Sequence, residues 1–491
     1  MSVSDAEYAA WLSSPSAMRC VLVEATVNVG GSEVVRYMSD KGYVTSPTDT
    51  PSNTNYRAII VGGVKLTESL SIDSNPTLTW GNIEIANING EFDSWLSDIW
   101  NNRQVSVYFG DMKWARSDFR LVFKGMASTI SSQRRDRLNI ILADSLQRLN
   151  TPMTDTRLGG TTSNKDKLLP LTFGECHNVS PLLVDPVLHD YQVHQGAIES
   201  IIEVRDNGAP ITVTPTLSTG KFRLIGSPVG TITASVQGNK PSTYDNSIAG
   251  NIKYIVKNYG TSSNRLTDSD IDLTNFSNFA SANTAPIGIY LSERANVLEV
   301  CQQIAGSVGA QVTMSRLGLL QLLRIDFPPS GTPTLITSSD MLERNLSVDS
   351  MVNVTPSIKI GYCKNWTVQN NLQTVIPEEH KALFALEYLT TTQSDSTVAT
   401  NYKMLVEPSE KDTLLLTTAD ANTEASRQLA NTKTQRTVYK FTGFAKMLSL
   451  TLGQAVTLKH NRYGLSSGKT GVVVGLEPDW INYRVVVKVM I

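Results

Sequence analysis

Residues 452–491, LGQAVTLKHNRYGLSSGKTGVVVGLEPDWINYRVVVKVMI, decide the fold class. In the last nine of them, apolar side chains recur at every second position, namely Tyr483, Val485, Val487, Val489 and Ile491. A period of two predicts a β-strand. Because a free chain end frays unless it is tied into structure, we expect this strand to be buried within a sheet.

Residues 464–470, GLSSGKT, end in the Gly-Lys-Thr of a phosphate-binding loop. That loop requires Gly-x-x-x-x-Gly-Lys-Thr, and Tyr463 stands where the first glycine belongs. The loop must also lead into a helix, whereas residues 471–475, GVVVG, are rich in β-branched valine. The segment therefore predicts a turn between two strands, and no nucleotide binding follows from it.

The composition favours sheets and interfaces over binding of nucleic acid. The chain has 491 residues, which suits about three domains. Charged residues make up 18% of it, below the usual ~25%, and the net charge is -2. A near-neutral chain gives no bulk attraction for nucleic acid or anionic lipid. The four cysteines are far apart in sequence, so the pattern predicts neither a metal knuckle nor a redox pair.

The N-terminus lacks the charged-then-apolar pattern of a secretion signal, and no apolar run has the length of a membrane span. We therefore expect a protein that is made and folded in a cytoplasm, without a membrane span.

The pattern along the chain predicts a mainly β protein with α+β insertions, built from several antiparallel barrels or sheets. Ser4 to Glu7 form a capping box that starts a short helix, and residues 30–57 are expected to be a long loop. Asn207-Gly208 predicts a tight hairpin. Apolar spacing predicts helices near residues 248–259 and 297–308.

Six parts are expected: an N-terminal helix or arm (1–17), an antiparallel β domain like a tube subunit (18–150), a polar connector (151–180), a small β domain (181–240), an α+β helix–hairpin domain (241–327) and a C-terminal β-barrel domain (336–491). The two large β regions form either separate barrels or two pieces of one layer, and the sequence does not choose between them.

The histidines and acidic residues offer few candidates for chemistry. Asp185, His189, Asp190 and His194 lie close in sequence, but Pro186 interrupts them and their spacing fits no zinc or iron site. We expect the two histidines to be exposed loop residues. The acidic cluster at 378–380 (EEH) is expected to be a solvated loop.

Two cysteines and one basic run are the remaining candidate sites. Cys176 and His177 are adjacent on an extended segment, so they face opposite sides and cannot form a catalytic dyad. Cys301 lies on the apolar face of a predicted helix and is expected to be a core thiol. Residues 134–137 (RRDR) are expected to form a turn in water or a subunit contact. We predict no catalytic, cofactor or metal residues and no enzyme activity, and the binding residues remain unknown.

Several stretches together resemble the tail hub proteins of long-tailed bacteriophages, which share a fold with the central baseplate hub of contractile tails. The resemblance covers residues 81–491, and the order of its motifs is more specific than any one of them. The stretches are 86–93 (ANINGEFD), 95–96 (WL), 105–111 (VSVYFGD), 123–125 (FKG), 170–174 (PLTFG), 178–181 (NVSP), the helix and hairpin at 296–318, 452–454 (LGQ), 462–465 (RYGL) and 468–469 (GK).

The resemblance implies a structural role in a virion tail tip or baseplate. It implies a homotrimer whose barrel-like domains form a pseudo-sixfold ring beneath a hexameric tail tube. Its neighbours would be a distal tail protein ring, the tail tube, the tape-measure protein and the fibres or spike, with no sequence-specific nucleic-acid binding.

Two alternatives remain open. A receptor- or glycan-binding tail protein would cluster aromatic residues such as Trp114, Trp366 and Trp480 on surface loops. A tail-tip hydrolase would carry a pair of carboxylates that only the fold brings together.

Overall fold

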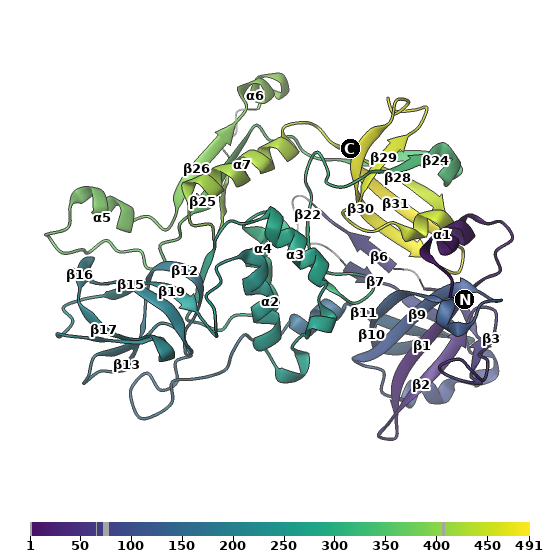
Figure 1. Ribbon diagram of the computed structural model, residues 1–491, viewed down its shortest axis with the longest axis horizontal. Helices are drawn as coiled ribbons and strands as arrows, with labels where there is room; N and C mark the ends of the chain where they lie inside the picture. The colour runs from purple at the N-terminus through teal and green to yellow at the C-terminus, as the bar shows by residue number, and fades with distance from the viewer. Residues whose placement is uncertain (1, 65, 72–77, 405–407) are drawn as a thin grey trace. The chain divides into compact units, whose positions relative to one another are not determined.

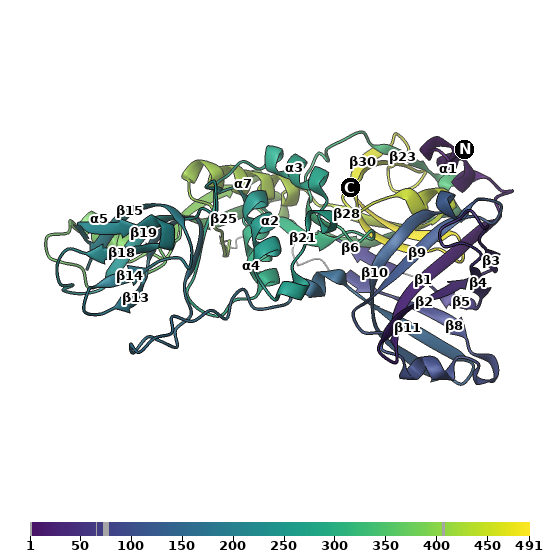
Figure 2. The ribbon, with the colours of Figure 1, turned by 60° about the horizontal axis from the view of Figure 1, so that its bottom comes forward.

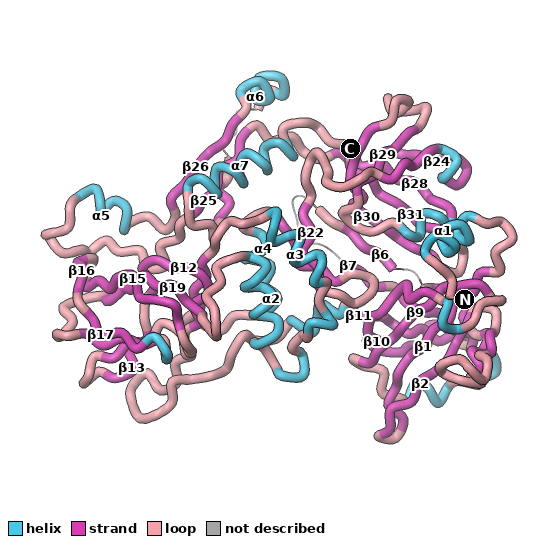
Figure 3. The backbone as a smooth tube through the Cα atoms, viewed as in Figure 1, coloured by secondary structure: helices cyan, strands magenta, loops and turns pink. Residues whose placement is uncertain are grey.

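The chain forms two compact units in a computed structural model (Figure 1). The structure describes residues 2–64, 66–71, 78–404 and 408–491. Unit 1 consists of Met1–Gln147, Thr313–Asn353 and Gln435–Ile491. Unit 2 consists of Arg148–Val312 and Val354–Thr434. Strands dominate unit 1, whereas most of the helices belong to unit 2 (Figure 3).

A large sheet forms the first layer of unit 1, and its strands run side by side in Figure 2. Across this sheet the described strands are β3 (Tyr43–Val44), β4 (Asn55–Ala58), β2 (Ser32–Ser39), β1 (Arg19–Val29), β9 (Arg103–Asp111), β10 (Arg120–Arg134), β11 (Arg137–Ala143), β8 (Asn82–Ala86) and β5 (Ile60–Gly63). Alternate residues of β1 from Val21 to Val27 are buried in the core, as the period of two predicts.

The long loop expected at residues 30–57 is wrong, because β2, β3 and most of β4 lie there. Gly30 and Gly31 both have positive φ, 58° and 94°, and pair Val29 with Ser32 in a two-residue hairpin. That turn favours glycine because both central residues are left-handed. The Ser, Thr, Asn and Pro content around the strands obscured this signal.

A second sheet completes unit 1. Its main path is β23 (Thr334–Thr337), β29 (Ala455–Lys459), β30 (Lys469–Asp479), β31 (Arg484–Met490), β28 (Thr437–Phe444) and β24 (Met341–Met351), with β6 (Leu66–Ser69) on β30 and β7 (Leu78–Trp80) on β6. The C-terminal strand β31 lies between β30 and β28, so its predicted burial is confirmed. Lys469 of the Gly-Lys-Thr motif starts β30, which is a strand and not a helix.

Both sheets of unit 1 contribute to one apolar core. Val23 and Phe109 from the first sheet belong to the same buried cluster as Val456 and Val487 from the second. The two large β regions therefore share a single core. The predicted capping box is also present, because the side chain of Ser4 accepts from Glu7 N at the start of α1 (Asp5–Ser13).

Unit 2 combines three small sheets with helices. Its five-stranded sheet runs β16 (Ala209–Ile211), β15 (Ile198–Asp206), β19 (Ile232–Asn239), β12 (Leu171–Val179) and β20 (Gly288–Leu291). The others run β13 (Leu182–Asp185), β14 (Asp190–Gln192), β18 (Lys221–Leu224) and β17 (Val213–Thr216), and β26 (Leu389–Ser394), β25 (Ser357–Tyr362) and β27 (Glu410–Asp412). Its helices are α2 (Ile248–Asn258), α3 (Leu273–Ala282), α4 (Val297–Gly306), α5 (Glu378–Phe384), α6 (Ser396–Tyr402) and α7 (Thr418–Thr432).

The hairpin of β21 (Ala310–Met314) and β22 (Leu320–Arg324) follows α4, as predicted. The remaining helical turns are short 3₁₀ segments at Ile88–Gly90, Asp93–Ser97, Arg116–Asp118, Ser145–Leu149, Leu217–Thr219, Ser262–Asn264, Asp268–Asp270, Ser338–Asp340 and Ala445–Ser449.

Several local predictions for unit 2 are confirmed and two are wrong. The hairpin at Asn207-Gly208 and the helices α2 and α4 are present. The polar connector at 151–180 is wrong in its last third, which forms the inner strand β12. The acidic segment at 378–380 belongs to helix α5 and not to a loop. The polar sequence before and within β12 does not predict a strand, and only residues 171–173 (LTF) indicate where β12 starts.

The fold is mainly β with several antiparallel sheets and helical insertions, as the sequence predicts. Within the described ranges, no helix is both long enough and apolar enough to cross a bilayer. The six-part division remains a prediction.

Candidate functional site

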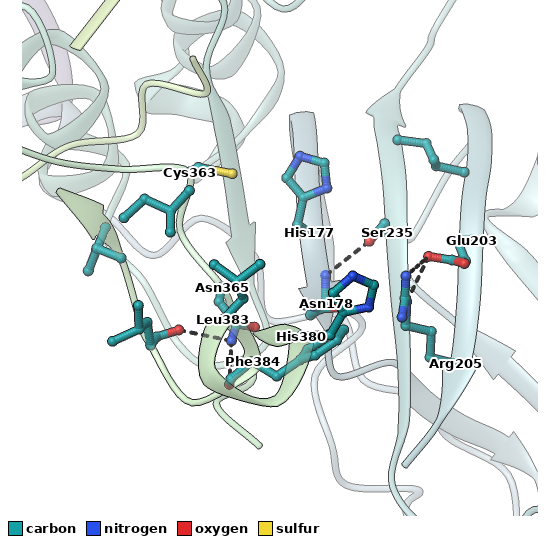
Figure 4. A pocket seen from close by; sticks show the side chains of 14 residues that line it. His177, Asn178, Glu203, Arg205, Ser235, Cys363, Asn365, His380, Leu383 and Phe384 are labelled. Atoms are coloured by element: carbon teal, nitrogen blue, oxygen red, sulfur yellow. Dashed lines mark hydrogen bonds and ion pairs between the residues drawn. The ribbon is translucent and has the colours of Figure 1, made fainter. Parts of the chain in front are cut away.

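A pocket of about 370 Å³ lies in unit 2, between the five-stranded sheet and the segment that leads from β25 through α5 to β26 (Figure 4). Its walls come from parts of the chain that are far apart in sequence. The lining residues are His177, Asn178, Ile202, Glu203, Arg205, Ser235, Cys363, Asn365, His380, Leu383, Phe384, Leu386, Tyr388 and Leu389.

The sheet side of the pocket is held by an ion pair and a turn. Arg205 pairs with Glu203 at 2.6 Å, and its Nη1 donates to the carbonyl oxygen of Gly208 at 2.9 Å. The guanidinium also lies 5.0 Å from the ring centroid of Phe384, which belongs to α5. Arg205 therefore ties the sheet to the opposite wall, and its charge is already satisfied.

Asn365 organises the other wall. Its Nδ2 donates to the carbonyl oxygens of Phe384 and Leu386 at 2.9 and 3.0 Å. Its backbone N–H donates to Glu387 O at 2.8 Å, and the next residue, Trp366, donates its N–H to His177 O at 3.1 Å. The buried side-chain amide of Asn365 thus binds the end of α5, and the next residue, Trp366, binds β12.

The pocket combines apolar surface with titratable side chains. Ile202, Leu383 and Leu386 are about half exposed and present apolar surface. His177 Nε2 lies 3.3 Å from Glu175 Oε1. Burial, and then the nearby charge of Glu175, raise the pKa of the Cys363 thiol, so it stays protonated at neutral pH and is a weak nucleophile. The lining residues therefore provide apolar contacts and satisfied polar groups.

Three of the four residues in the candidate metal cluster bind other partners. Asp190 pairs with Arg223 at 2.6 Å, and Asp185 Oδ1 accepts from the backbone of Val187 at 2.8 Å. The expectation that both histidines are exposed is wrong for His194, which is buried. Among the described residues, no group of three or more His, Cys, Asp or Glu side chains is placed to hold a metal ion.

His194 is a buried neutral side chain that supports β12. Its Nδ1 accepts from the backbone N–H of Thr172 at 2.9 Å, which fixes the remaining ring proton on Nε2. Burial lowers the pKa of His194 to about 4. Local sequence does not indicate this role, because Thr172 lies 22 positions away.

The cysteine predictions agree with the structure. Cys176 is buried in the core of the five-stranded sheet, whereas its neighbour His177 is partly exposed. Their side chains thus face opposite sides of β12. Cys301 is fully buried on α4, and burial raises the pKa of its thiol.

The basic run and the tryptophans do not form a binding cluster. Residues 134–137 include the exposed turn between β10 and β11, as predicted. Trp480 is buried, and Trp114 packs against Trp11 with ring centroids 4.7 Å apart. Trp366 belongs to unit 2 and packs against the core of its five-stranded sheet.

Unit 1 presents a long strand edge that sequence analysis did not single out. Within the described part of the chain, β24 has eleven residues and pairs only with β28. Tyr463 and His460 reach backbone oxygens near the start of β24, at Leu346 and Arg344. Residues 347–351 lie beyond these contacts and are exposed, with Val348 at 39% and Met351 at 58%.

Comparisons with known proteins give structural likenesses only. No protein-family profile matches the sequence, and no curated protein matches it. The 43 kDa tail protein of prophage MuSo2 from Shewanella oneidensis is 11% identical, with 96% of this chain and 98% of that chain covered and a TM-score of 0.41.

Two other solved structures are similar at the same level. The tail protein from Neisseria meningitidis MC58 is 10% identical, with 96% of each chain covered and a TM-score of 0.38. A chain of the virion of a native gene transfer agent particle is 11% identical, with 70% of this chain and 91% of that chain covered and a TM-score of 0.42.

Proposed function

We propose that this chain is a structural hub protein of a bacteriophage tail tip or baseplate. Three copies form a ring that links the tail tube to the distal fibres or spike. Its neighbours are the distal tail protein ring and the tape-measure protein, and it resides in the virion. Its role is assembly and not catalysis.

The exposed edge of β24 is the observation that carries this proposal. A monomeric protein usually protects such an edge with lysine, proline or a covering segment. Residues 345–351, NLSVDSM, contain neither lysine nor proline. The edge has a register shift between Val348 and Ser350, so its exposed Val348 and Met351 suit side-chain packing against a neighbouring subunit.

The sequence adds independent support. The motifs that resemble tail hubs occur in order over residues 81–491. The low charged content of 18% suits a surface that other subunits cover, since the centres of interfaces are depleted in charged residues. The apolar pocket beside α5 offers a second place for contact.

Light scattering of the purified full-length chain tests the proposal. We expect a mass about three times the 53.7 kDa of one chain. The double variant Val348→Lys and Met351→Lys places charge on the edge and should shift the mass toward one chain. The matched control is Ile225→Lys, which changes a 70% exposed side chain of unit 2 and should leave the trimer intact.

A single-chain mass for the wild-type protein at high concentration would contradict the ring. An activity assay addresses the hydrolase alternative. We expect no loss of turbidity in a peptidoglycan suspension and no release of sugar from polysaccharide. Cleavage that depends on one acidic or histidine side chain would overturn the proposed role.

A further inference from the structure

A second, polar pocket of about 430 Å³ lies in unit 2 at the C-terminal end of α2. Three parts of the chain surround it: residues 152–156, Gln195 and residues within 254–265. Met153 makes two backbone hydrogen bonds beside the pocket. Its N–H donates to Ala295 O at 2.8 Å, and its carbonyl oxygen accepts from Gly260 N at 3.1 Å. The loop before the pocket is therefore fixed on both sides.

Two tyrosines line this pocket, Tyr254 on the last turn of α2 and Tyr259 directly after the helix, and a buried ring packs against both. Phe173, which is fully buried, lies 5.4 Å from the ring of Tyr259 and 6.4 Å from that of Tyr254, measured between centroids. The two tyrosine rings lie 6.1 Å apart at 64°. Edge-to-face packing of this kind fixes ring orientation without using the hydroxyl groups.

Several polar atoms of the pocket have no hydrogen-bond partner among the described residues. In the described part of the chain, the hydroxyls of Tyr254 and Tyr259 have no hydrogen-bond partner. Among the residues that the structure describes, Gln195 uses only its Oε1, which accepts from Thr154 Oγ1 at 3.4 Å, and its Nε2 has no partner. Arg265 donates through Nε to Gly260 O at 3.2 Å, which leaves its terminal nitrogens available.

Acceptors are present beside these donors. Asp155 is 73% exposed and lies 3.5 Å from Arg294, so its carboxylate keeps free lone pairs. Burial raises the pKa of Tyr259, which keeps its hydroxyl protonated and able to both donate and accept. One carboxylate and one guanidinium together give the pocket little net charge, which disfavours an ionic ligand.

We propose that this pocket binds a neutral saccharide. A sugar presents many hydroxyls that each donate and accept. The pocket offers a polar complement: amide and guanidinium donors, a carboxylate acceptor, and two tyrosine hydroxyls that can both donate and accept. The inference does not depend on the hub role, because it uses residues of unit 2 alone.

Saturation-transfer NMR on the full-length protein tests this site. The probes are maltotriose, triacetylchitotriose and raffinose, each at millimolar concentration, with inorganic phosphate as a separate arm. We expect at least one saccharide to receive saturation and to give a measurable Kd, and phosphate to have no effect on that Kd.

Two variants tie the signal to the pocket. Tyr254→Phe keeps the ring and removes one hydroxyl, and Gln195→Leu removes the free amide. Each should weaken binding about three- to tenfold, as expected for loss of one hydrogen bond. Tyr402→Phe is the matched control, because Tyr402 is 46% exposed on α6 and does not line the pocket. Circular dichroism confirms that the variants remain folded.

Three results would overturn the proposal. The first is no binding of any probe saccharide to the wild-type chain. The second is binding that neither Tyr254→Phe nor Gln195→Leu weakens relative to Tyr402→Phe. The third is binding of phosphate alone. A trimeric mass has no bearing on these outcomes, so failure of this inference and failure of the hub role are distinguishable.

Discussion

The two units differ in how they bury charge. In unit 1, Arg316 pairs with Glu68 at 2.9 Å across 248 positions of sequence, and both side chains are almost fully buried. In unit 2, Arg427 pairs with Glu424 at 2.6 Å within one helix, three residues apart. The first pair links distant segments of the chain, whereas the second belongs to a single turn of α7.

Arg316 also binds backbone carbonyl groups that do not pair within the sheets. Its terminal nitrogens donate to the carbonyl oxygens of Leu448 and Leu450 at 3.1 and 2.8 Å, and its own carbonyl accepts from Lys124 N at 2.8 Å. Arg316 thus links its own segment to three other parts of unit 1, two of them through its side chain. We infer that unit 1 unfolds as one cooperative body, while unit 2 tolerates local changes.

Replacing Arg316 should have the largest effect on stability. Arg316→Met leaves Glu68 buried without its partner and strands two carbonyl oxygens. Loss of one member of a buried ion pair costs about 3–5 kcal/mol. Urea denaturation measures the free energy of unfolding, and hydrogen exchange should show faster exchange across both sheets of unit 1. Exchange confined to residues 313–324 would contradict the cooperative account.

Acid should destabilise unit 2 through His194. The folded-state pKa of about 4 lies below the ordinary value of 6.5, so the unfolded chain binds the proton more readily. The stability that neutral His194 contributes is fully present above pH 6.5 and is lost as the pH falls toward 4. At pH 4.5 this loss lowers the free energy of unfolding by roughly 2–3 kcal/mol relative to neutral pH.

His194→Asn provides the control for this pH effect, because asparagine places an oxygen near Nδ1 and does not titrate. The free energy of unfolding of the variant should therefore fall less than that of the wild-type chain between pH 7 and pH 4.5. An equal fall in both proteins would show that His194 is not responsible.

The pair in α7 should matter less than the pair in unit 1. Arg427→Met removes the partner of Glu424, but Gln428 Nε2 still donates to the same carboxylate at 2.7 Å. We expect a loss of about 2 kcal/mol. Hydrogen exchange should increase in α7 and the adjacent β25, and stay unchanged in unit 1. A loss as large as that of Arg316→Met would remove the contrast between the units.

The smallest effect should be a gain. Gly306 ends α4, and a Cβ at this position would meet nothing within 4 Å. Gly306→Ala should stabilise unit 2 by about 0.5–1 kcal/mol, because alanine has less backbone freedom to lose on folding. Gly174→Ala is the opposite case, since its Cβ would lie 1.8 Å from Ile287 O at a positive φ. Stabilisation by both changes would contradict this packing.

Sequence periodicity predicted the most regular parts of the fold. The alternation of β1 and β31, the helix faces of α2 and α4 and the Asn-Gly hairpin each arise from neighbours within about ten residues. Strand β12 was missed because its partners β19 and β20 lie far away in sequence. The strands at 30–57 pair locally and were missed because of the Ser, Thr, Asn and Pro residues around them. Local composition there indicates loops.

The candidate sites were beyond sequence analysis for the same reason. The apolar pocket joins His177, Arg205 and Leu383, which come from three distant segments. The polar pocket combines Tyr254 with Gln195 and Asp155. Residues 464–470 could be predicted as a turn between strands, because a phosphate-binding loop depends on local spacing and on a following helix, whereas β30 follows here.

Electron cryo-microscopy of virus particles that contain this chain tests the central claim most directly. The account predicts three copies in a ring at the end of the tail tube, with residues 347–351 of each copy buried against a neighbouring subunit. Density for the chain elsewhere in the particle, or a ring in which β24 faces solvent in every copy, would contradict it.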